Sequence, residues 1–434
     1  MYIKQLEIKN IRSIDNFEMN FEENEAGWHV IIGDNGAGKS TIIRSIALAL
    51  VGPEEALGLR ADWRDWLKHQ TNEGKILLHI QPSDYDKHTG RQAKLKNKLI
   101  PNIIEFKRNN GVVNFSSGKE INGLNPRTYN WGQGNGWFSV AYGPFRRFEG
   151  GNQDWDKIFI AYPKLGAHLS AFGEDVALTE ALEWLVKLQY QALEFQTNIR
   201  KEQDATGIIE NLKKLINSPD FLPHKAEIDN ISSDGVIFKD GNGFNINVNQ
   251  LSDGYRSVLS LTFELIRQLV RVYGADNVFR NIRQDEMHID LPGVVLIDEV
   301  DAHLHPTWQT RIGQWFTKYF PNIQFIVTTH SPLICRACDN GSIWRLAAPG
   351  SNIPSGKIAE HDKNKLINGD VLDAYGTTIF GKGVTISIEA VKKKEKLDEL
   401  STKKRNGKLN PEEEKELKKL QYELMFPSDD TIEL

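Results

Sequence analysis

The sequence predicts an α/β protein in which helices flank a mainly parallel sheet. Three apolar runs, at residues 28–32, 294–297 and 324–328, have the composition of strands that are buried on both faces. Helical patterns alternate with these runs at about 39–50, 255–272 and 308–319. Because a helix between two strands returns the chain to the same end of the sheet, such strands pair in parallel.

A second, antiparallel layer is expected near the start of the chain. Four segments there have strand patterns: 3–8, 17–21, 75–81 and 102–116. Asn110 and Gly111 interrupt the last segment, and an Asn-Gly pair between two strands is a strong hairpin signal. We assign residues 1–117 to an N-terminal lobe that contains this layer and a glycine-rich turn at residues 33–38.

The next part of the chain, residues 118–235, is expected to be an insert. Glycine, asparagine, tryptophan and proline are frequent from 118 to 155, which predicts a long irregular segment. Leucines at helical spacing follow between 176 and 195, and residues 209–216 continue the helical pattern. The insert therefore combines an irregular loop with helices.

A second lobe is expected at residues 236–345. It begins with strand patterns at 236–238 and 244–248, and it contains the helix and the apolar runs that complete the parallel sheet. The two lobes together are expected to enclose one functional site, since the motifs described below lie in both.

The C-terminal extension, residues 346–434, differs in character. Lysine and glutamate dominate it from 392 to 424. A helix restarts at Asn410 and Pro411, a capping residue followed by proline in the first turn. A narrow apolar seam follows, made of Leu417, Leu420 and Leu424. This pattern predicts a charged helical hairpin.

The composition limits the kinds of binding partner and the cellular compartment that we expect. The formal net charge is -5, so a positively charged surface that binds nucleic acid can only be a local patch. The two cysteines, Cys335 and Cys338, are too few for a disulfide scaffold and suit a reducing compartment. No run approaches the roughly 18 apolar residues of a membrane helix, and the chain opens directly on a strand pattern. We therefore expect a cytoplasmic protein.

The glycine-rich turn fits a phosphate-binding loop. Residues 33–40 read Gly-Asp-Asn-Gly-Ala-Gly-Lys-Ser between an apolar strand and a helix, which is the context that this motif requires. The glycines let backbone N–H groups wrap the phosphates, Lys39 reaches the terminal phosphates and the Ser40 hydroxyl ligates Mg²⁺. The sequence therefore predicts ATP and Mg²⁺ as cofactors. The expected nucleotide-binding residues are Asn35, Gly36, Ala37, Gly38, Lys39, Ser40 and Thr41.

Paired carboxylates supply the second half of such a site. Asp298 and Glu299 directly follow the apolar run 294–297. Asp298 is expected to hold the Mg²⁺ shell, and Glu299 to orient or deprotonate the attacking water. Carboxylates at the end of a buried strand can also be merely solvated, but the phosphate loop upstream favours the catalytic interpretation.

A third motif, at residues 251–255, reads Leu-Ser-Asp-Gly-Tyr and opens a helix. Alone, such a turn is only a helix cap. With the phosphate loop before it and the paired carboxylates and His330 after it, the set resembles the ABC ATPase superfamily, although its third and fifth residues depart from the Leu-Ser-Gly-Gly-Gln of transport ATPases. The resemblance implies that Ser252 and Gly254 contact the terminal phosphate held by a second copy. It also implies that His330 is the switch histidine facing that phosphate.

The subgroup is indicated by three segments. Residues 8–13, the signature motif and residues 298–306 resemble the SMC-like and OLD-like AAA ATPases of DNA repair and phage defence. That similarity implies that Asn10 and Arg12 line the nucleotide and that Asp301 lies at the dimer seam. The helical insert is too short for the coiled-coil arms of chromosome-organising ATPases.

Two further segments narrow the resemblance. Residues 141–147 and 172–178 are similar to stand-alone defence ATPases such as the PtuA subunit of Septu, retron ATPases and the AriA subunit of PARIS. This implies a separate effector, either an HNH nuclease like PtuB or a Toprim protein like AriB, and a phage protein or nucleic acid as trigger. Either Gln81 or the loop at 142–147 is expected to serve as the glutamine loop.

No nuclease site is expected in this chain itself. Asp362, Asp370 and Asp373 are scattered and form no cluster in the sequence. Basic candidates for contact with nucleic acid or an effector, or simply for solvated surface, are Arg146, Arg147 and residues 392–394.

We therefore predict a slow or regulated ATP hydrolase that dimerises head to head around ATP. Its expected role is that of a sensor and scaffold for a separate nuclease or toxin in anti-phage defence. The first alternative is a DNA repair or maintenance ATPase that acts directly on DNA, which predicts ATP-dependent DNA binding with a steep salt dependence. The second is an ABC transporter motor, which predicts co-purification with a membrane subunit.

Overall fold

The computed structural model describes most of the chain. The described residues are 1–21, 25–59, 62–88, 98–121, 123–132, 134–145, 161–173, 179–196, 205–219, 221–222, 226–232, 235–284, 286–351, 354–370 and 388–424. The chain divides into two compact units, Met1–Asn368 and Gly369–Leu434. In the described part of the chain, no helix has the length and apolar character needed to cross a membrane.

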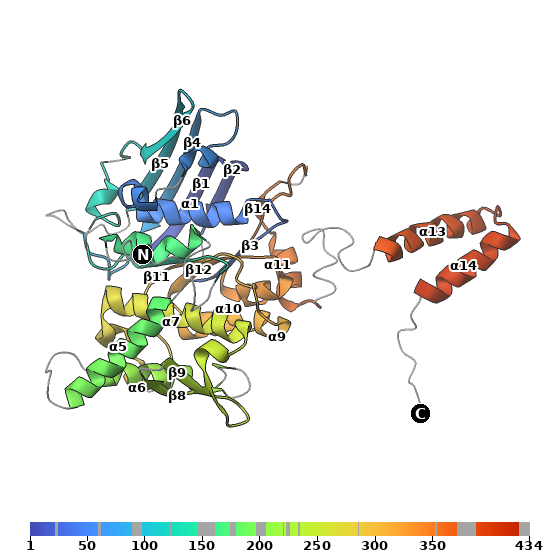
Figure 1. The fold of residues 1–434 in the computed structure, drawn as a ribbon. Helices are drawn as coiled ribbons and strands as arrows, with labels where there is room; N and C mark the ends of the chain where they lie inside the picture. Colours follow the sequence, from blue (N-terminus) through green and yellow to red (C-terminus); the bar gives the residue numbers. More distant parts are fainter. Residues whose placement is uncertain are drawn as a thin grey trace. The chain divides into compact units, whose positions relative to one another are not determined.

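A six-stranded sheet forms the centre of the first unit (Figure 1). Its strands are β3 (Gly27–Ile32), β7 (Ser139–Tyr142), β11 (Gly293–Ile297), β12 (Ile323–Thr329), β13 (Ile343–Arg345) and β14 (Gly356–Lys357). Their order is β14-β13-β3-β12-β11-β7, and each neighbouring pair is parallel except β13 and β14. Every residue of β3, β11 and β12 is buried, as expected for parallel strands covered on both faces. The predicted α/β class with a mainly parallel sheet is confirmed.

A five-stranded antiparallel sheet forms the second layer, with the order β2-β1-β4-β5-β6. Its strands are β1 (Tyr2–Ile11), β2 (Ile14–Asn20), β4 (Glu73–Gln81), β5 (Ile100–Asn109) and β6 (Val112–Ser117). Asn110 and Gly111 connect the last two strands with φ of 49° and 81°, the left-handed pair that an Asn-Gly hairpin turn requires. The predicted antiparallel layer and its hairpin are confirmed.

Helix α1 (Lys39–Val51) lies between the two sheets (Figure 1). Eleven of its 13 residues are buried. They share one hydrophobic core with residues of the five-stranded sheet, such as Ile8 and Ile104, and of the six-stranded sheet, such as Leu296 and Ile326. A helix covered on nearly all sides must be apolar nearly all round. The helix that follows the phosphate loop is thus fixed by both sheets.

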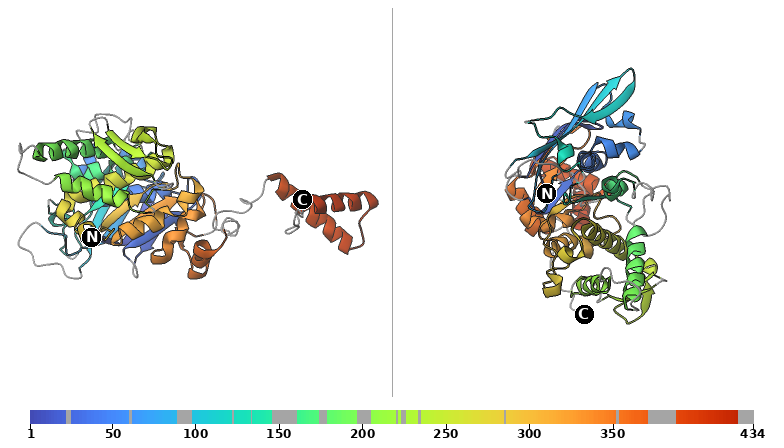
Figure 2. Two further views of the ribbon diagram at one scale, coloured as in Figure 1. Left: turned by 90° about the horizontal axis from the view of Figure 1, so that it is seen from below. Right: turned by 90° about the vertical axis from the view of Figure 1, so that its left-hand side faces the viewer.

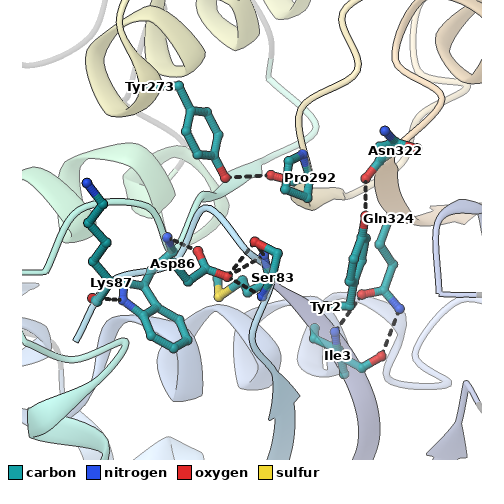
Figure 3. Close-up of polar contacts among 11 residues, drawn as sticks. Tyr2, Ile3, Ser83, Asp86, Lys87, Tyr273, Pro292, Asn322 and Gln324 are labelled. Carbon is teal, nitrogen blue, oxygen red and sulfur yellow. Dashed lines mark hydrogen bonds and ion pairs between the residues drawn. The ribbon is translucent and has the colours of Figure 1, made fainter. Parts of the chain in front are cut away.

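Polar contacts also join the two sheets (Figure 3). Gln324, near the start of β12, accepts a hydrogen bond from the Ile3 N–H (2.7 Å) and donates one to the Ile3 carbonyl (2.9 Å). Ile3 precedes the part of β1 that pairs with β2, which starts at Gln5. Because buried main-chain groups need partners, the Gln324 amide takes the place of a strand at this point.

The helical insert lies at the end of the unit opposite to the five-stranded sheet (Figures 1 and 2). Helices α5 (Thr179–Gln196) and α6 (Ala205–Ile216) pack against each other there. A three-stranded antiparallel sheet accompanies them, made of β8 (Glu227–Ser232), β9 (Gly235–Lys239) and β10 (Asn245–Asn247). Strand β8 was not predicted. A bulge after Ile228 puts its buried isoleucines, Ile228 and Ile231, three positions apart and breaks the two-residue alternation of a strand.

The first unit contains further described α-helices. They are α2 (Pro53–Ala56), α4 (Pro163–His168), α7 (Asp253–Tyr273), α8 (Ala275–Val278), α9 (Pro306–Gln309), α10 (Ile312–Tyr319) and α11 (Glu360–Asn368). Of these, α4, α7 and α10 pack against strands of the six-stranded sheet. Helix α7 confirms the helix predicted at 255–272. The helix predicted at 308–319 is confirmed for its larger part, α10, whereas residues 306–309 form a separate short helix, α9, and Thr310 and Arg311 lie between the two.

The second unit contains a helical hairpin, α13 (Ile388–Arg405) and α14 (Pro411–Leu424). Leu400, Leu417 and Leu420 form its small core. Asn410 and Glu413 cap the start of α14 reciprocally: the Glu413 N–H donates to the Asn410 side chain (2.7 Å), and the Asn410 N–H donates to the Glu413 carboxylate (3.1 Å). The predicted charged hairpin is confirmed.

Candidate nucleotide site

The phosphate-binding loop lies between the end of β3 and the start of α1. Gly36 and Gly38 adopt φ of 77° and 101°, a region that glycine enters without steric cost. Gly38 also has little room, since an added Cβ would lie 3.1 Å from atoms of Ser13 and Ile14. Because α1 begins at Lys39, the loop stands at a helix N-terminus, where backbone N–H groups and the helix dipole favour an anion.

The Lys39 side chain folds back over this loop. Its ammonium group donates hydrogen bonds to the carbonyls of Gly33 (2.8 Å) and Asp34 (3.1 Å). Lys39 is 6% exposed, and burial lowers the pKa of its ammonium group. Four carboxylates oppose this shift: Glu299, Asp298, Asp301 and Asp34. The lysine of the loop and the carboxylates that follow β11 therefore share one electrostatic environment.

Asp298 and Glu299 directly follow β11. Asp298 is 2% exposed, and its N–H donates to the carbonyl of Tyr142 at the end of the neighbouring strand β7 (2.8 Å). Glu299 has a φ of 48°. This left-handed conformation costs a residue other than glycine about 1–3 kcal/mol and persists only where the surroundings impose it. The backbone of the pair is therefore held by tertiary contacts.

One of these contacts comes from Thr328 near the end of β12. This threonine is 0% exposed. Its Oγ1 donates to Asp298 Oδ1 (2.5 Å) and accepts a hydrogen bond from the Glu299 N–H (2.7 Å). The Thr328 carbonyl also accepts a hydrogen bond from the N–H of Val300 (2.9 Å). The strand that precedes His330 thus holds the strand end that carries the paired carboxylates.

Thr329 makes a similar contact one residue later. Its Oγ1 donates to Asp301 Oδ1 (2.6 Å) and accepts a hydrogen bond from the Ser331 N–H (2.9 Å). His330, between these two anchored residues, is exposed. Since β3, β11 and β12 are parallel neighbours, the histidine lies at the same edge of the sheet as the phosphate loop and the paired carboxylates.

The signature residues lie at the start of α7. Ser252 is the N-cap of this helix, and its side chain makes no capping hydrogen bond. Ser252 and Asp253 are exposed, and Asp253 forms an ion pair with Arg256. An added Cβ on Gly254 would lie 3.1 Å from the carbonyl oxygen of His303. Within one chain, the signature turn therefore adjoins the segment that follows the carboxylates.

Asn10 and Arg12 lie at the end of β1 with left-handed φ of 54° and 49°. The Asn10 amide donates to the Glu73 carbonyl of β4 (3.0 Å), and the Arg12 guanidinium lies over the Trp66 ring, 5.0 Å from its centroid. Burial lowers the pKa of Arg12, and the charge of Arg44 on α1 adds to this effect. The residues that follow Arg12, Ser13 and Ile14, lie beside Gly38 of the phosphate loop.

Comparison with protein families decides the class of the chain. A family model described as an AAA domain matches residues 5–240, more than half of the chain. The chain belongs to the AAA domain family. A second model, whose description adds an AbiEii toxin and a type IV toxin–antitoxin system to the AAA domain, matches residues 175–336. Family membership supports ATP binding and hydrolysis with a divalent metal, usually Mg²⁺.

Named relatives and a solved structure resemble this AAA domain protein. The Septu protein PtuA of Bacillus mycoides (strain KBAB4) is 27% identical over 347 residues, which are 79% of this chain and 40% of the relative's own length. The retron Vc95 probable ATPase of Vibrio cholerae serotype O1 biovar El Tor is 26% identical over 411 residues, 79% of this chain and 74% of that protein. A solved SMC head bound to the C-winged helix domain of ScpA is 15% identical, with a TM-score of 0.45, and the match covers 82% of this chain and 97% of that one. The predicted resemblance to PtuA and the retron ATPases is confirmed.

The structure separates the two positions considered for the glutamine loop of this AAA domain protein. Gln81 pairs with Tyr2 at the start of β1, and the Tyr2 hydroxyl donates to the Asn322 carbonyl just before β12 (3.0 Å; Figure 3). Gln81 thus lies near the amino end of β12, roughly 20 Å along the strand from Thr328. Tyr142, at the end of β7, adjoins the paired carboxylates instead. Of the two positions, the loop after β7 begins at the edge that holds the phosphate loop.

The other residues named from the sequence lie in different surroundings. In the phosphate loop and the first turn of α1, Asn35 is exposed, Ser40 is half-buried and Thr41 is buried. Asp362 lies on α11, whereas Asp370 belongs to the second unit. Four calls lie outside the described residues: Arg146, Arg147, residues 174–178 and Asp373.

Sequence reasoning missed Thr328 and Thr329, because it assigned a role only to the histidine after them. The sequence did contain a feature that pointed to them. Two consecutive hydroxyl residues end an otherwise mainly apolar strand, and a buried hydroxyl requires a hydrogen-bond partner. Its partner could be named only once β12 was known to lie beside β11.

The two cysteines are buried and free, and burial raises the pKa of both thiols. A thiol kept protonated in an apolar interior is a poor nucleophile and a poor metal ligand. In the portion of the chain that the structure describes, no group of three or more histidine, cysteine, aspartate and glutamate residues is arranged to hold a metal.

Proposed function

We propose that this chain binds Mg²⁺ and ATP at the carboxyl edge of the six-stranded sheet and hydrolyses the ATP. The observation that carries the proposal is geometric: the phosphate loop follows β3 and the carboxylates Asp298 and Glu299 follow β11, and both strands pair in parallel with β12, so the loop and the carboxylates lie at one edge of the sheet. In open α/β sheets, ligands bind at the carboxyl ends of the strands.

The residues present fit these ligands. The loop combines left-handed glycines, a helix N-terminus and the Lys39 ammonium group, which suits a triphosphate. The Ser40 hydroxyl and the Asp298 carboxylate offer oxygen ligands, which Mg²⁺ prefers together with water and phosphate oxygens. When bound, the metal would neutralise charge on the terminal phosphates.

The remaining roles follow from position. Glu299 orients or deprotonates the attacking water, an action that typically contributes about 10²–10⁴-fold to a rate. Lys39 balances negative charge on the transferring phosphoryl group. His330, exposed at the same edge, contacts the terminal phosphate and reports whether it is present.

A second copy completes the site in this proposal. Ser252 is exposed at the start of the 21-residue helix α7, and its hydroxyl is not used as a cap. A helix N-terminus with a polar side chain and a glycine suits a phosphate group. Ser252 and Gly254 of one head therefore close over the terminal phosphate held by the other head. Because each composite site needs residues of both heads, hydrolysis is slow or regulated in a single copy.

The biological role is proposed from the relatives. Septu and retron proteins are similar over 79% of this chain, which supports a function in anti-phage defence. Head closure around ATP and release after hydrolysis give two states that a separate nuclease or toxin subunit can distinguish. We therefore assign the chain as the sensor and scaffold of such an effector, with a phage product as trigger.

A subunit-mixing experiment tests the two-copy site. Lys39→Ala removes the ammonium group of the loop, and Ser252→Arg obstructs the signature turn. Each variant alone is expected to hydrolyse ATP at least about 100-fold more slowly than wild type. In an isologous dimer a mixed pair keeps one intact composite site, so an equimolar mixture should recover roughly a quarter of wild-type turnover.

The control is a pair of affinity tags that confirms formation of mixed dimers. If tagged mixed dimers form and remain as inactive as the single variants, each site is built within one chain and the two-copy proposal is wrong. Full activity of Ser252→Arg alone would contradict it as well.

A further inference from the structure

Two threonine hydroxyls at the end of β12 lie in an unusual place. Thr328 and Thr329 are both 0% exposed, and valine would fill nearly the same space. Burying a hydroxyl is unfavourable unless it is hydrogen-bonded. Each of these hydroxyls donates to a carboxylate that follows the neighbouring strand β11.

The Thr328 hydroxyl contacts both members of the carboxylate pair. It donates to Asp298 Oδ1 at 2.5 Å and accepts from the Glu299 N–H at 2.7 Å. A hydroxyl has one donor and two acceptor positions, so the two contacts are compatible. The first limits rotation of the Asp298 carboxylate, which gives its second oxygen a fixed direction. The second holds the main chain of Glu299 at its left-handed φ of 48°, which sets where the Glu299 side chain leaves the backbone.

We propose that Thr328 is a positioning residue for ATP hydrolysis. Its single hydroxyl aligns the proposed metal ligand, Asp298, with the proposed base, Glu299, and links both to the strand that carries His330. The inference rests on the proposed function, because it names how that site is held. Residues that orient metal ligands from behind typically change metal affinity or activity by about 10–100-fold when they are removed.

Thr329 provides an internal comparison. Its hydroxyl is equally buried and also donates to a carboxylate, but the carboxylate is Asp301, and the second contact is the Ser331 N–H. It therefore orders the segment after the carboxylate pair and leaves Asp298 and Glu299 untouched. Thr329→Val is expected to lower turnover less than Thr328→Val.

The test uses three substitutions in the full chain. Thr328→Val removes the hydroxyl at nearly constant volume, and Thr328→Ser keeps it. Thr262→Val is the matched control, since Thr262 is 0% exposed and its hydroxyl donates only to a backbone carbonyl of α7, that of Val258 (2.8 Å). The measurements are steady-state ATP hydrolysis, the Mg²⁺ concentration that gives half-maximal binding of a fluorescent ATP analogue, and the melting temperature.

The expected result is specific to the hydroxyl. Thr328→Val lowers kcat about 10–100-fold with little change in KM and raises the Mg²⁺ requirement for analogue binding. Thr328→Ser keeps most of the turnover, and Thr262→Val hydrolyses ATP like wild type while losing a similar amount of thermal stability. Should Thr328→Val fail to fold, Thr328→Cys gives the same test, because a thiol is nearly the same size but a weak donor.

Two results overturn the inference. If Thr328→Val equals Thr262→Val in kcat and in Mg²⁺ requirement, the Thr328 hydroxyl does not position the site. Equal losses for Thr328→Val and Thr328→Ser would mean that packing, not the hydroxyl, is responsible. Failure of the underlying ATPase proposal looks different. Wild type and Glu299→Gln would then have the same turnover, whatever residue occupies position 328.

Discussion

The carboxyl edge of the six-stranded sheet and the signature turn of α7 are built in opposite ways. At the edge, Asp298 is 2% exposed and Thr328 is 0% exposed, and they are hydrogen-bonded to each other. At the turn, Ser252 and Asp253 are exposed, and the serine makes no capping hydrogen bond although serine is a favoured N-cap. The first region satisfies its polar groups during folding, whereas the second keeps hydrogen-bonding capacity for another molecule.

This difference has a physical basis. A buried polar group without a partner costs about 1–3 kcal/mol, so the buried polar groups of the edge need hydrogen-bond partners within their own chain. An exposed hydroxyl loses little, because water replaces the missing partner. Substitutions at the edge should therefore affect chemistry and stability strongly, and substitutions at the turn should leave the isolated fold almost unchanged.

The largest expected effect comes from Glu299→Gln. Loss of the proposed base should lower turnover about 10³-fold, equivalent to roughly 4 kcal/mol of activation free energy. ATP should still bind, so the proposed dimer should persist and appear as a doubled mass in light scattering with ATP. Protection of cells against phage should be lost.

An exposed glutamate of α5, Glu183, offers the matched control for that experiment. Glu183→Gln should leave turnover and mass unchanged. If Glu299→Gln hydrolyses ATP as fast as Glu183→Gln, the edge does not carry the chemistry and the comparison between the two regions loses its functional meaning.

A smaller effect is expected at the other end of β12. Gln324→Leu leaves the N–H and carbonyl of Ile3 without their partner, so the free energy of unfolding should fall by about 2–4 kcal/mol. Urea denaturation measures this value. Gln314→Leu on the exposed side of α10 is the control and should change stability by less than about 0.5 kcal/mol. Equal effects of the two substitutions would mean that the hydrogen bonds between Gln324 and the main chain of Ile3 contribute little to the free energy of unfolding.

The smallest effect is expected at the signature turn. Asp253→Ala breaks the ion pair with Arg256. The Asp253 side chain is 68% exposed and the Arg256 side chain is 31% exposed. Solvent screens such pairs, so the unfolding free energy should fall by no more than about 1 kcal/mol, and less at high salt. The same denaturation measurement at low and high salt checks this. A loss as large as that of Gln324→Leu would mean that the turn is part of the folded core.

Much of the fold could be predicted because its main strands are mainly apolar. The runs that became β3, β11 and β12 have the composition of strands covered on both faces, and the helices between them follow a helical spacing. Strand β8 could not be predicted, since its bulge hides the alternation. The break between α9 and α10 was also missed, because Arg311 has no sequence feature that forbids a helix.

The candidate site divides in the same way. The phosphate loop, Asp298, Glu299 and the signature turn could be proposed from the sequence, because each motif is local and each residue type has a defined chemistry. Thr328 was missed, because its role depends on a hydrogen bond to a neighbouring strand and not on its own surroundings in the sequence. Gln81 was left as an alternative, because strand patterns do not say which end of a sheet a residue reaches.

The sequence by itself determined the α/β class, the two motif-bearing strand ends and the capacity for nucleotide chemistry, since backbone periodicity and side-chain type are local properties. Only the tertiary structure decided which strands are neighbours. That choice places Gln81 near the amino end of β12 and joins Thr328 to the two carboxylates. Hydrogen bonds between strands act over a few ångströms, so they exist only after long-range packing has brought the strands together.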